Sequence, residues 1–184
     1  MAIRKIVISG VLAAIAILLG VTRLGFIPVP TAAGNATIMH VPAIIGGIME
    51  GGWVGAIIGL IFGLFSFVDA TVPLFKDPLV AVLPRIFIGV TAFLVYAGLK
   101  RWNEYLALIV AAVVGSMTNT ILVLGMAVVR NYMTAPVAAT TAAINGIPEA
   151  IVAAIFTVAV VTAWKRVETG GGKSKVSDVQ PKRN

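Results

Sequence analysis

The sequence contains no cysteine and a single histidine, and charged residues make up only 11% of its 184 positions. Without cysteine there are no disulfides, thiolate metal sites or cysteine nucleophiles. A lone histidine lacks partners for a zinc site, and seven acidic residues are too sparse to suggest a hydrolytic pair. We therefore expect no catalytic residues, no metal and no cofactor in this chain, and predict that it is not an enzyme.

A nucleotide-binding loop is also missing. Gly172, Lys173 and Ser174 look like the end of such a loop, but Val167 occupies the position of its required first glycine. Without an ATP motif or a row of charges along a water-filled path, the chain cannot power pumping by itself. Any active transport would need an external source of energy.

Apolar residues dominate what is present. They make up 59% of the chain, and the mean hydropathy is +1.03. The length allows about five or six helices of roughly 20 residues each. The composition predicts an all-α membrane protein with one domain over residues 1–165. The polar segment 166–184, rich in glycine and charge, is expected to be a disordered cytoplasmic tail.

Breaks in the apolar pattern place six helices and three loops. The second run is too short to cross a hydrocarbon core of about 30 Å, so we expect a short helix buried among the others. The loops are expected at 27–36, 69–78 and 130–136. The helices are expected over about 6–21, 37–49, 53–68, 79–99, 106–129 and 137–164.

The basic residues indicate an orientation. If the amino terminus is cytoplasmic, ten of the fourteen basic residues fall inside. Reading residues 1–22 as a signal peptide would leave the basic tail on the wrong side. We therefore predict a multi-pass protein of a bacterial or archaeal cytoplasmic membrane, with both termini in the cytoplasm. The four exceptions lie near the outer ends of helices: Arg23, Lys76, Arg85 and Arg130.

Polar residues inside the apolar runs predict a binding pocket. Arg23 and Arg85 lie within or against such runs, where an unpaired charge costs several kcal/mol or more. Asn145 and Glu149 are four residues apart and share one helix face. Several such groups at one depth, beneath loops on one side, favour a small-molecule pocket. The candidate substrate-binding residues are Asn35, His40, Arg85, Asn119, Asn145 and Glu149.

Each candidate has an expected role. Arg85 is expected to bind an anionic group of the ligand, with the two asparagines as neutral hydrogen-bond partners and His40 as a further donor. Glu149 would orient Arg85 or contact a ligand hydroxyl. Each residue could instead be structural, with Arg85 and Glu149 forming a buried ion pair. A small oligomeric channel or scaffold is the alternative of another class, although polar groups confined to one half of the bundle favour a closed cup.

Small residues mark helix contacts. Gly55, Gly59 and Gly63 recur every four residues and lie on one face of the third helix, where another backbone can approach closely. The first helix carries two similar pairs, Gly10 with Ala14 and Ala16 with Gly20. Either pair could pack inside the monomer or dock another membrane protein.

Four segments carry a resemblance to a known family. They are 36–51 (ATIMHVPAIIGGIMEG), 54–66 (VGAIIGLIFGLFS), 77–89 (DPLVAVLPRIFIG) and 115–120 (GSMTNT). Together with the helix order, they resemble the substrate-binding S component of energy-coupling-factor (ECF) vitamin transporters. The likeness covers nearly all of residues 5 to 165 and is greatest for the pantothenate type.

This resemblance implies a six-helix bundle that captures a vitamin at the outer face, beneath the loops after helices one, three and five. It also implies a transmembrane coupling subunit and two cytoplasmic ATPases, which use ATP and topple the S component so that its pocket opens inward. The family's docking pair would fall on Gly10 and Ala14, with Ala16 and Gly20 as the other choice. A carboxylate ligand such as pantothenate would suit Arg85. Riboflavin, a pyridoxine-type ligand and a cobalamin precursor remain alternatives.

Overall fold

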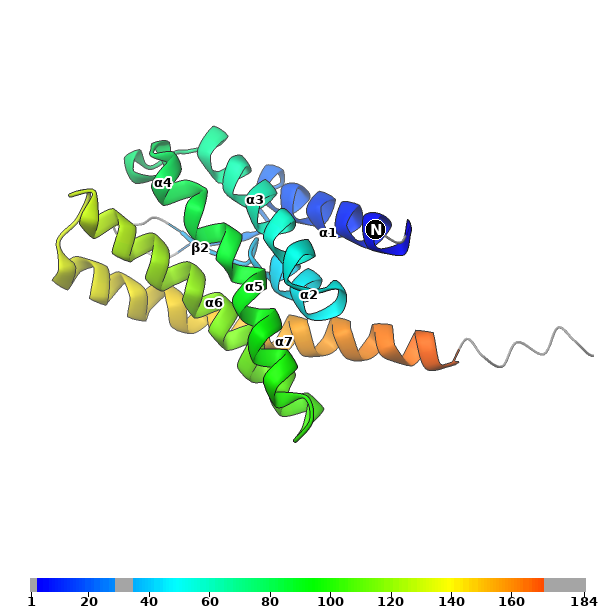
Figure 1. Ribbon diagram of the computed structural model, residues 1–184. Coiled ribbons are helices and arrows are strands. Elements are labelled where there is room, and N and C mark those ends of the chain that lie inside the picture. The colour runs from blue at the N-terminus through cyan, green and yellow to red at the C-terminus, as the bar shows by residue number, and fades with distance from the viewer. Residues whose placement is uncertain (1–2, 29–34, 171–184) are drawn as a thin grey trace, which may run out of the picture.

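A computed structural model describes residues 3–28 and 35–170, and the described part is a bundle of helices (Figure 1). The bundle confirms the prediction of a helical fold. The helices are α1 (Ile3–Val21), α2 (Val41–Glu50), α3 (Gly52–Val68), the 3-10 helix η1 (Pro73–Lys76), α4 (Pro78–Ala81), α5 (Leu83–Leu99), α6 (Glu104–Val129) and α7 (Ala135–Gly170). The six apolar runs correspond to α1, α2, α3, α4 together with α5, α6 and α7, and the short 3-10 helix lies in the loop expected at 69–78.

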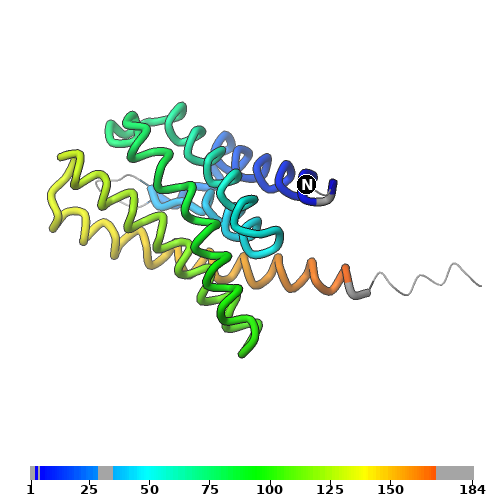
Figure 2. Tube along the Cα trace, viewed as in Figure 1, coloured from blue at the N-terminus to red at the C-terminus, as the bar shows by residue number. Residues whose placement is uncertain are grey.

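From α3 onward, the long helices pack side by side in the order in which they occur in the chain. Helix α5 lies between α3 and α6, and α6 lies between α5 and α7. Helix α1 packs against α2 and α3 at the other side of the bundle (Figure 2). Three helical segments, 78–99, 104–129 and 135–168, are long and apolar enough to cross a membrane. The protein is therefore a multi-pass membrane protein.

Helix α2 is short and buried, as the sequence predicted. Pro42 stands in its first turn, where a missing N–H costs nothing, and Gly51 ends it with a φ of 107° that favours glycine. Every residue of α2 except Met49 is buried. Because α2 contacts α1, α3, α5, α6 and α7, it forms the centre of the core.

Glycines bring α3 and α5 into backbone contact. A Cβ built on Gly55 would lie 2.7 Å from the Cα of Gly89, and one on Gly59 would clash with the backbone carbonyl oxygen of Arg85. A Cβ on Gly63 would lie 2.9 Å from the Cα of Val82. The predicted glycine stripe is therefore a helix contact inside the monomer, and it sets the position of Arg85.

Two features differ from the sequence expectation. The run expected as one helix over 79–99 is divided at Val82 into α4 and α5, with Pro84 in the first turn of α5. Pro84 gives a physical reason for the division, because proline cannot supply the N–H that an interior helical position needs. In addition, two short antiparallel strands, β1 (Phe26–Ile27) and β2 (Ala36–Thr37), flank the first loop.

The carboxyl-terminal boundary also differs. Helix α7 passes through Pro148 and continues to Gly170, five residues past the domain end expected at 165. The expected disordered tail otherwise falls on residues 171–184, which lie outside the described part of the chain.

An ion pair fastens the loop after α6 to the start of α4. Asp77 is 6% exposed, accepts a hydrogen bond from the backbone N–H of Leu79 at 3.0 Å, and accepts one from Nε of Arg130 at 2.6 Å. The hydrogen bond from Arg130 holds the pKa of Asp77 below its ordinary value. The pair thus joins two loops at one end of the bundle.

We expect this pair to make stability depend on pH. A carboxyl with a lowered folded pKa contributes stability above its unfolded pKa of about 3.9, and this is lost as pH falls through the folded pKa. Asp77→Asn should therefore lower the melting temperature at pH 7, and its deficit relative to the unmodified protein should shrink below about pH 4. Thermal melts at both pH values test this. An equal deficit at every pH would show that the charge of Asp77 contributes nothing.

Candidate ligand-binding site

Two adjoining cavities lie beneath the loops at one end of the bundle. The larger has a volume of about 140 Å³ and lies between the loop after α1, the end of α3 and the loop before α4. The smaller, of about 50 Å³, lies between α6 and α7. Both are lined by Asn35, Thr37, Phe75 and Arg85, so these residues form the boundary that the cavities share.

Arg85 is a buried cation at this boundary. Arg85 is 3% exposed to solvent, and its Nη1 donates a hydrogen bond to the backbone carbonyl of Val80 at 2.5 Å. The guanidinium carbon lies 5.4 Å from the ring centroid of Phe62 and 4.9 Å from that of Phe75. Its Nε has no hydrogen-bond partner among the described residues. The aromatic rings hold the guanidinium without neutralising it.

Glu149 does not form the ion pair with Arg85 that was considered from sequence. Its Oε1 accepts from the backbone N–H of Thr37 at 2.6 Å, and its Oε2 accepts from Oγ1 of Thr120 at 3.2 Å. Among the described residues, no salt bridge joins Glu149 to Arg85. Glu149 therefore fastens strand β2 to α6 and α7, and it acts on Arg85 only through space, without a direct ion pair.

The two asparagines lie where a neutral polar group can reach them. Asn119 on α6 and Asn145 on α7 both line the smaller cavity, together with Arg85 and Glu149. Asn119 is 5% exposed, and its side-chain oxygen has no hydrogen-bond partner among the described residues. A buried amide oxygen without a partner is costly, which favours a donor from a ligand at this position.

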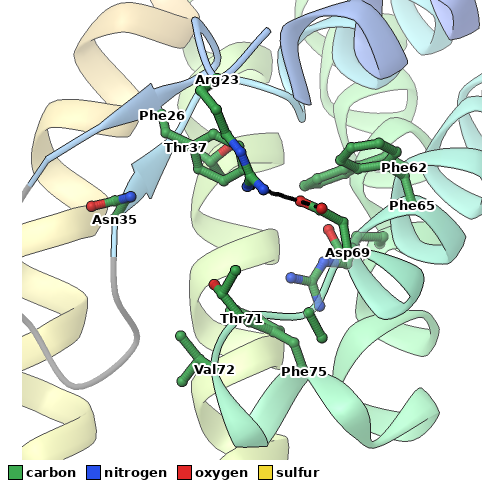
Figure 3. Close-up of a pocket in the computed structure, with 13 residues that line it drawn as sticks. Arg23, Phe26, Asn35, Thr37, Phe62, Phe65, Asp69, Thr71, Val72 and Phe75 are labelled. Carbon is green, nitrogen blue, oxygen red and sulfur yellow. Dashed lines mark hydrogen bonds and ion pairs between the residues drawn. The ribbon is translucent and has the colours of Figure 1, made fainter. Parts of the chain in front are cut away.

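A second arginine lies at the larger cavity, as Figure 3 shows. Arg23 forms a two-point ion pair with Asp69, at 2.8 Å and 3.1 Å, and its guanidinium carbon is 5.4 Å from the ring centroid of Phe26. Arg23 has a left-handed φ of 62°, which ends α1 just before the loop. The pair thus joins the ends of α1 and α3 across one side of the cavity.

The structure brings five of the six candidate residues to the smaller cavity: Asn35, Arg85, Asn119, Asn145 and Glu149. The sixth, His40, is fully buried and lines neither cavity. It stands directly before α2, with the backbone of Thr37 and the charge of Arg85 as its polar surroundings. A role for His40 in direct ligand contact has no geometric support in this conformation.

Several lining residues could not be identified from sequence. Phe62 belongs to an apolar run and looks like an ordinary core residue, and Phe75 lies in the expected loop 69–78 with no charge to mark it. Thr37 and Thr120 have no charge to mark them, although both belong to the quoted family-like segments. Asp69 follows the last residue of α3, and its position at a helix end is the signal that could have found it.

The two small-residue pairs of α1 have different surroundings. Gly10 and Ala14 are exposed, and nothing lies within 4 Å of a Cβ placed on Gly10. Ala16 is fully buried, and a Cβ on Gly20 would lie 2.6 Å from the terminal methyl of Met39. Ala16 and Gly20 therefore pack inside the monomer, which leaves Gly10 and Ala14 available to a partner.

Comparisons with known proteins agree with this architecture. The chain matches the family model "ECF transporter, substrate-specific component" over residues 4–163. It is 34% identical over 156 residues to the pantothenic acid transporter PanT of Lactococcus lactis subsp. cremoris, an alignment that covers 69% of this chain and 76% of PanT.

A solved structure of ThiT from Listeria monocytogenes has a similar fold, with a TM-score of 0.63 and 14% identity over 89% of this chain and 96% of ThiT. The matched family consists of transporter components, so the prediction that the chain is not an enzyme is confirmed. Because the family model matches nearly the whole helical bundle, this chain belongs to the substrate-specific (S) components of ECF transporters.

Proposed function

We propose that this chain captures pantothenate for import and that Arg85 binds the carboxylate of the vitamin. One observation carries the proposal: a buried guanidinium, with no carboxylate paired to it in the described structure, lies at the boundary of two cavities. A cation in a site of low dielectric strongly favours an anionic partner. The similarity to PanT supports the choice of vitamin.

The surrounding groups suit the rest of such a ligand. Pantothenate carries an amide and hydroxyl groups in addition to its carboxylate, and Asn119 and Asn145 place two side-chain amides in the smaller cavity. The rings of Phe62 and Phe75 offer apolar contact in the larger one. Both cavities are smaller than the roughly 300 to 1,000 Å³ typical of sites for drug-sized ligands. Their size favours a compact vitamin over a flavin or a cobalamin precursor.

The proposal includes an orientation. The basic residues Lys100, Arg101, Lys165 and Arg166 lie at the end of the bundle away from the cavities, and cytoplasmic ends carry such residues. We therefore place both termini in the cytoplasm of a bacterial or archaeal cell and the ligand site toward the outside. The shorter helices α1, α2 and α3 complete six membrane-embedded segments with the three long ones.

The chain also needs partners, because its sequence has no nucleotide-binding loop. We propose that a transmembrane coupling subunit and two ATPases drive uptake by toppling the S component in the membrane, as the family resemblance implies. The exposed pair Gly10 and Ala14 is the surface of α1 on which the coupling subunit would dock.

We expect Gly10→Leu to block uptake while leaving vitamin binding unchanged. The new side chain would project away from the bundle, so it would obstruct only a close approach by another helix. Uptake of labelled pantothenate by cells, measured beside binding to the purified variant, tests this. The control is Ile15→Val, a small change at an exposed position of the same helix away from the Gly10 and Ala14 stripe, which should preserve both activities. Loss of binding by Gly10→Leu would instead assign Gly10 to internal packing.

Binding of a vitamin panel to the purified protein tests the proposed function as a whole. Isothermal titration in detergent with pantothenate, riboflavin, pyridoxine and a cobalamin precursor should give tight binding of one pantothenate per chain. Absence of binding to every vitamin, combined with ion conduction in liposomes, would contradict the proposal and favour the channel alternative.

A further inference from the structure

A third cavity lies at the opposite end of the bundle from the vitamin site. It has a volume of about 220 Å³, is open to the surroundings, and is lined by the end of α2, the last turns of α5 and the carboxyl-terminal part of α7. In Figure 1 this part of α7 diverges from the paired ends of α5 and α6. The cavity shares no lining residue with the two described above.

Two lysines face one aromatic ring in this cavity. Nζ of Lys100 lies 5.8 Å from the ring centroid of Tyr96, and Nζ of Lys165 lies 5.4 Å from it. Lys165 donates to the hydroxyl of Tyr96 at 2.8 Å and pairs with Glu104, so its ammonium group is fixed in place. Both lysines line the cavity together with one acidic residue, Glu168, and Glu104 offsets the charge of Lys165 from beside the cavity.

Lys100 is the cation that can donate hydrogen bonds to a ligand. Among the described residues it forms no hydrogen bond or ion pair, and its contact with the Tyr96 ring leaves its three ammonium donors unused. The neighbouring Arg101 and Arg166 add further positive charge at the same end. The cavity is therefore complementary to an anion.

The other half of the lining is apolar. Ile48, Met49, Val161 and Trp164 line the cavity beside the lysines. Exposed Trp102 and Tyr105 lie at the same end of the bundle, and such aromatic residues concentrate at the level of lipid headgroups. A fully hydrated anion would make no use of this apolar wall, whereas an amphiphile would contact both halves.

We propose that this cavity binds the phosphate-bearing headgroup of an anionic glycerophospholipid from the surrounding leaflet. Lys100 and Lys165 contact the phosphate oxygens, and Trp164 with the aliphatic side chains contacts the glycerol and the first carbons of an acyl chain. Basic pockets between transmembrane helices on the cytoplasmic side are suited to anionic lipids for this electrostatic reason. The site is separate from the vitamin cavities, and its existence does not depend on which vitamin is bound.

Thermal unfolding and native mass spectrometry of the full chain in a neutral detergent test the proposal. Added phosphatidylglycerol should raise the melting temperature and remain bound as one molecule per chain, while phosphatidylcholine should do neither. Lys100→Ala should weaken the apparent affinity for phosphatidylglycerol about fivefold, the effect of one lysine near a lipid surface. Lys100→Arg, which keeps the positive charge, should bind phosphatidylglycerol with the affinity of the unmodified protein.

The matched control is Lys76→Ala, an exposed lysine at the vitamin-binding end, which should bind phosphatidylglycerol as the unmodified protein does. Equal stabilisation by the two lipids, or unchanged affinity in Lys100→Ala, would overturn the proposal. Stabilisation by soluble glycerol 3-phosphate to the same extent would identify a free phosphate site instead. Lost uptake with unchanged lipid binding in Lys100→Ala would identify a contact with a protein partner and would also overturn it.

Discussion

Replacing Arg85 with alanine is expected to weaken pantothenate binding by about 2 to 5 kcal/mol, which is roughly thirtyfold to several thousandfold. The guanidinium is buried between Phe62 and Phe75 and has one carbonyl partner, Val80, so a bound carboxylate would be the first anion in direct contact with it. Alanine would leave that carboxylate desolvated without a cation. Isothermal titration of the purified variant measures the loss.

The bundle itself should tolerate this replacement, because removal of a buried charge without an ion-pair partner also removes its desolvation cost. The melting temperature of Arg85→Ala without vitamin should therefore change far less than its affinity. The pantothenate affinity of Arg85→Lys should fall between those of the unmodified protein and Arg85→Ala. Lysine keeps the charge but loses the planar, two-point geometry of the guanidinium. Lys76→Ala, which lies outside both cavities, serves as the control for general loss of positive charge. Unchanged affinity in Arg85→Ala would remove Arg85 from the site.

Replacing Gly59 with alanine is expected to damage the site without touching a ligand. The added Cβ would clash with the backbone carbonyl oxygen of Arg85 and lie 2.9 Å from its carbonyl carbon, and no flexible side chain stands between them to yield. Helices α3 and α5 would have to separate. We expect stability to fall by about 1 to 3 kcal/mol and affinity to fall about tenfold or more, as when a hydrogen bond to a charged group is lost.

Denaturant unfolding and vitamin titration of Gly59→Ala measure the two effects. Gly125→Ala is the matched control, because Gly125 lies in the interior of α6 and a Cβ placed on it would have nothing within 4 Å. This control should be neutral or stabilising by up to about 1 kcal/mol, since alanine is the better helix former. Normal stability and affinity in Gly59→Ala would show that the two helices are not held at backbone contact by this glycine.

Most helices could be predicted because apolar runs in a membrane protein end at charges, glycines and prolines. The short run at 37–49 correctly indicated the buried helix α2, since its length alone prevents it from spanning a bilayer. The division at Val82 was missed, because hydropathy continues through α4 and α5 and only Pro84 signals the break. Strands β1 and β2 were missed because a two-residue pair leaves no periodic pattern.

The residues that line the smaller cavity could be anticipated in part for a related reason. Arg85, Asn119 and Asn145 stand out as polar residues in apolar helices, and such residues must turn inward. Their convergence on one cavity agrees with that expectation. The sequence could not show which group would donate a hydrogen bond to Glu149. Thr37 is 112 residues away along the chain and contacts Glu149 only because of tertiary packing. The sequence also could not show that Arg23, singled out with Arg85, would pair with Asp69 beside the larger cavity.

The most direct test compares pantothenate with pantothenol, its neutral analogue in which an alcohol replaces the carboxylate, in the unmodified protein and in Arg85→Gln. Titration of both ligands into both proteins gives the coupling between the guanidinium and the carboxylate. We predict that the unmodified protein prefers pantothenate by at least about thirtyfold and that Arg85→Gln binds both ligands with similar affinity. The same preference in both proteins would contradict the assignment of Arg85 as the residue that binds the carboxylate.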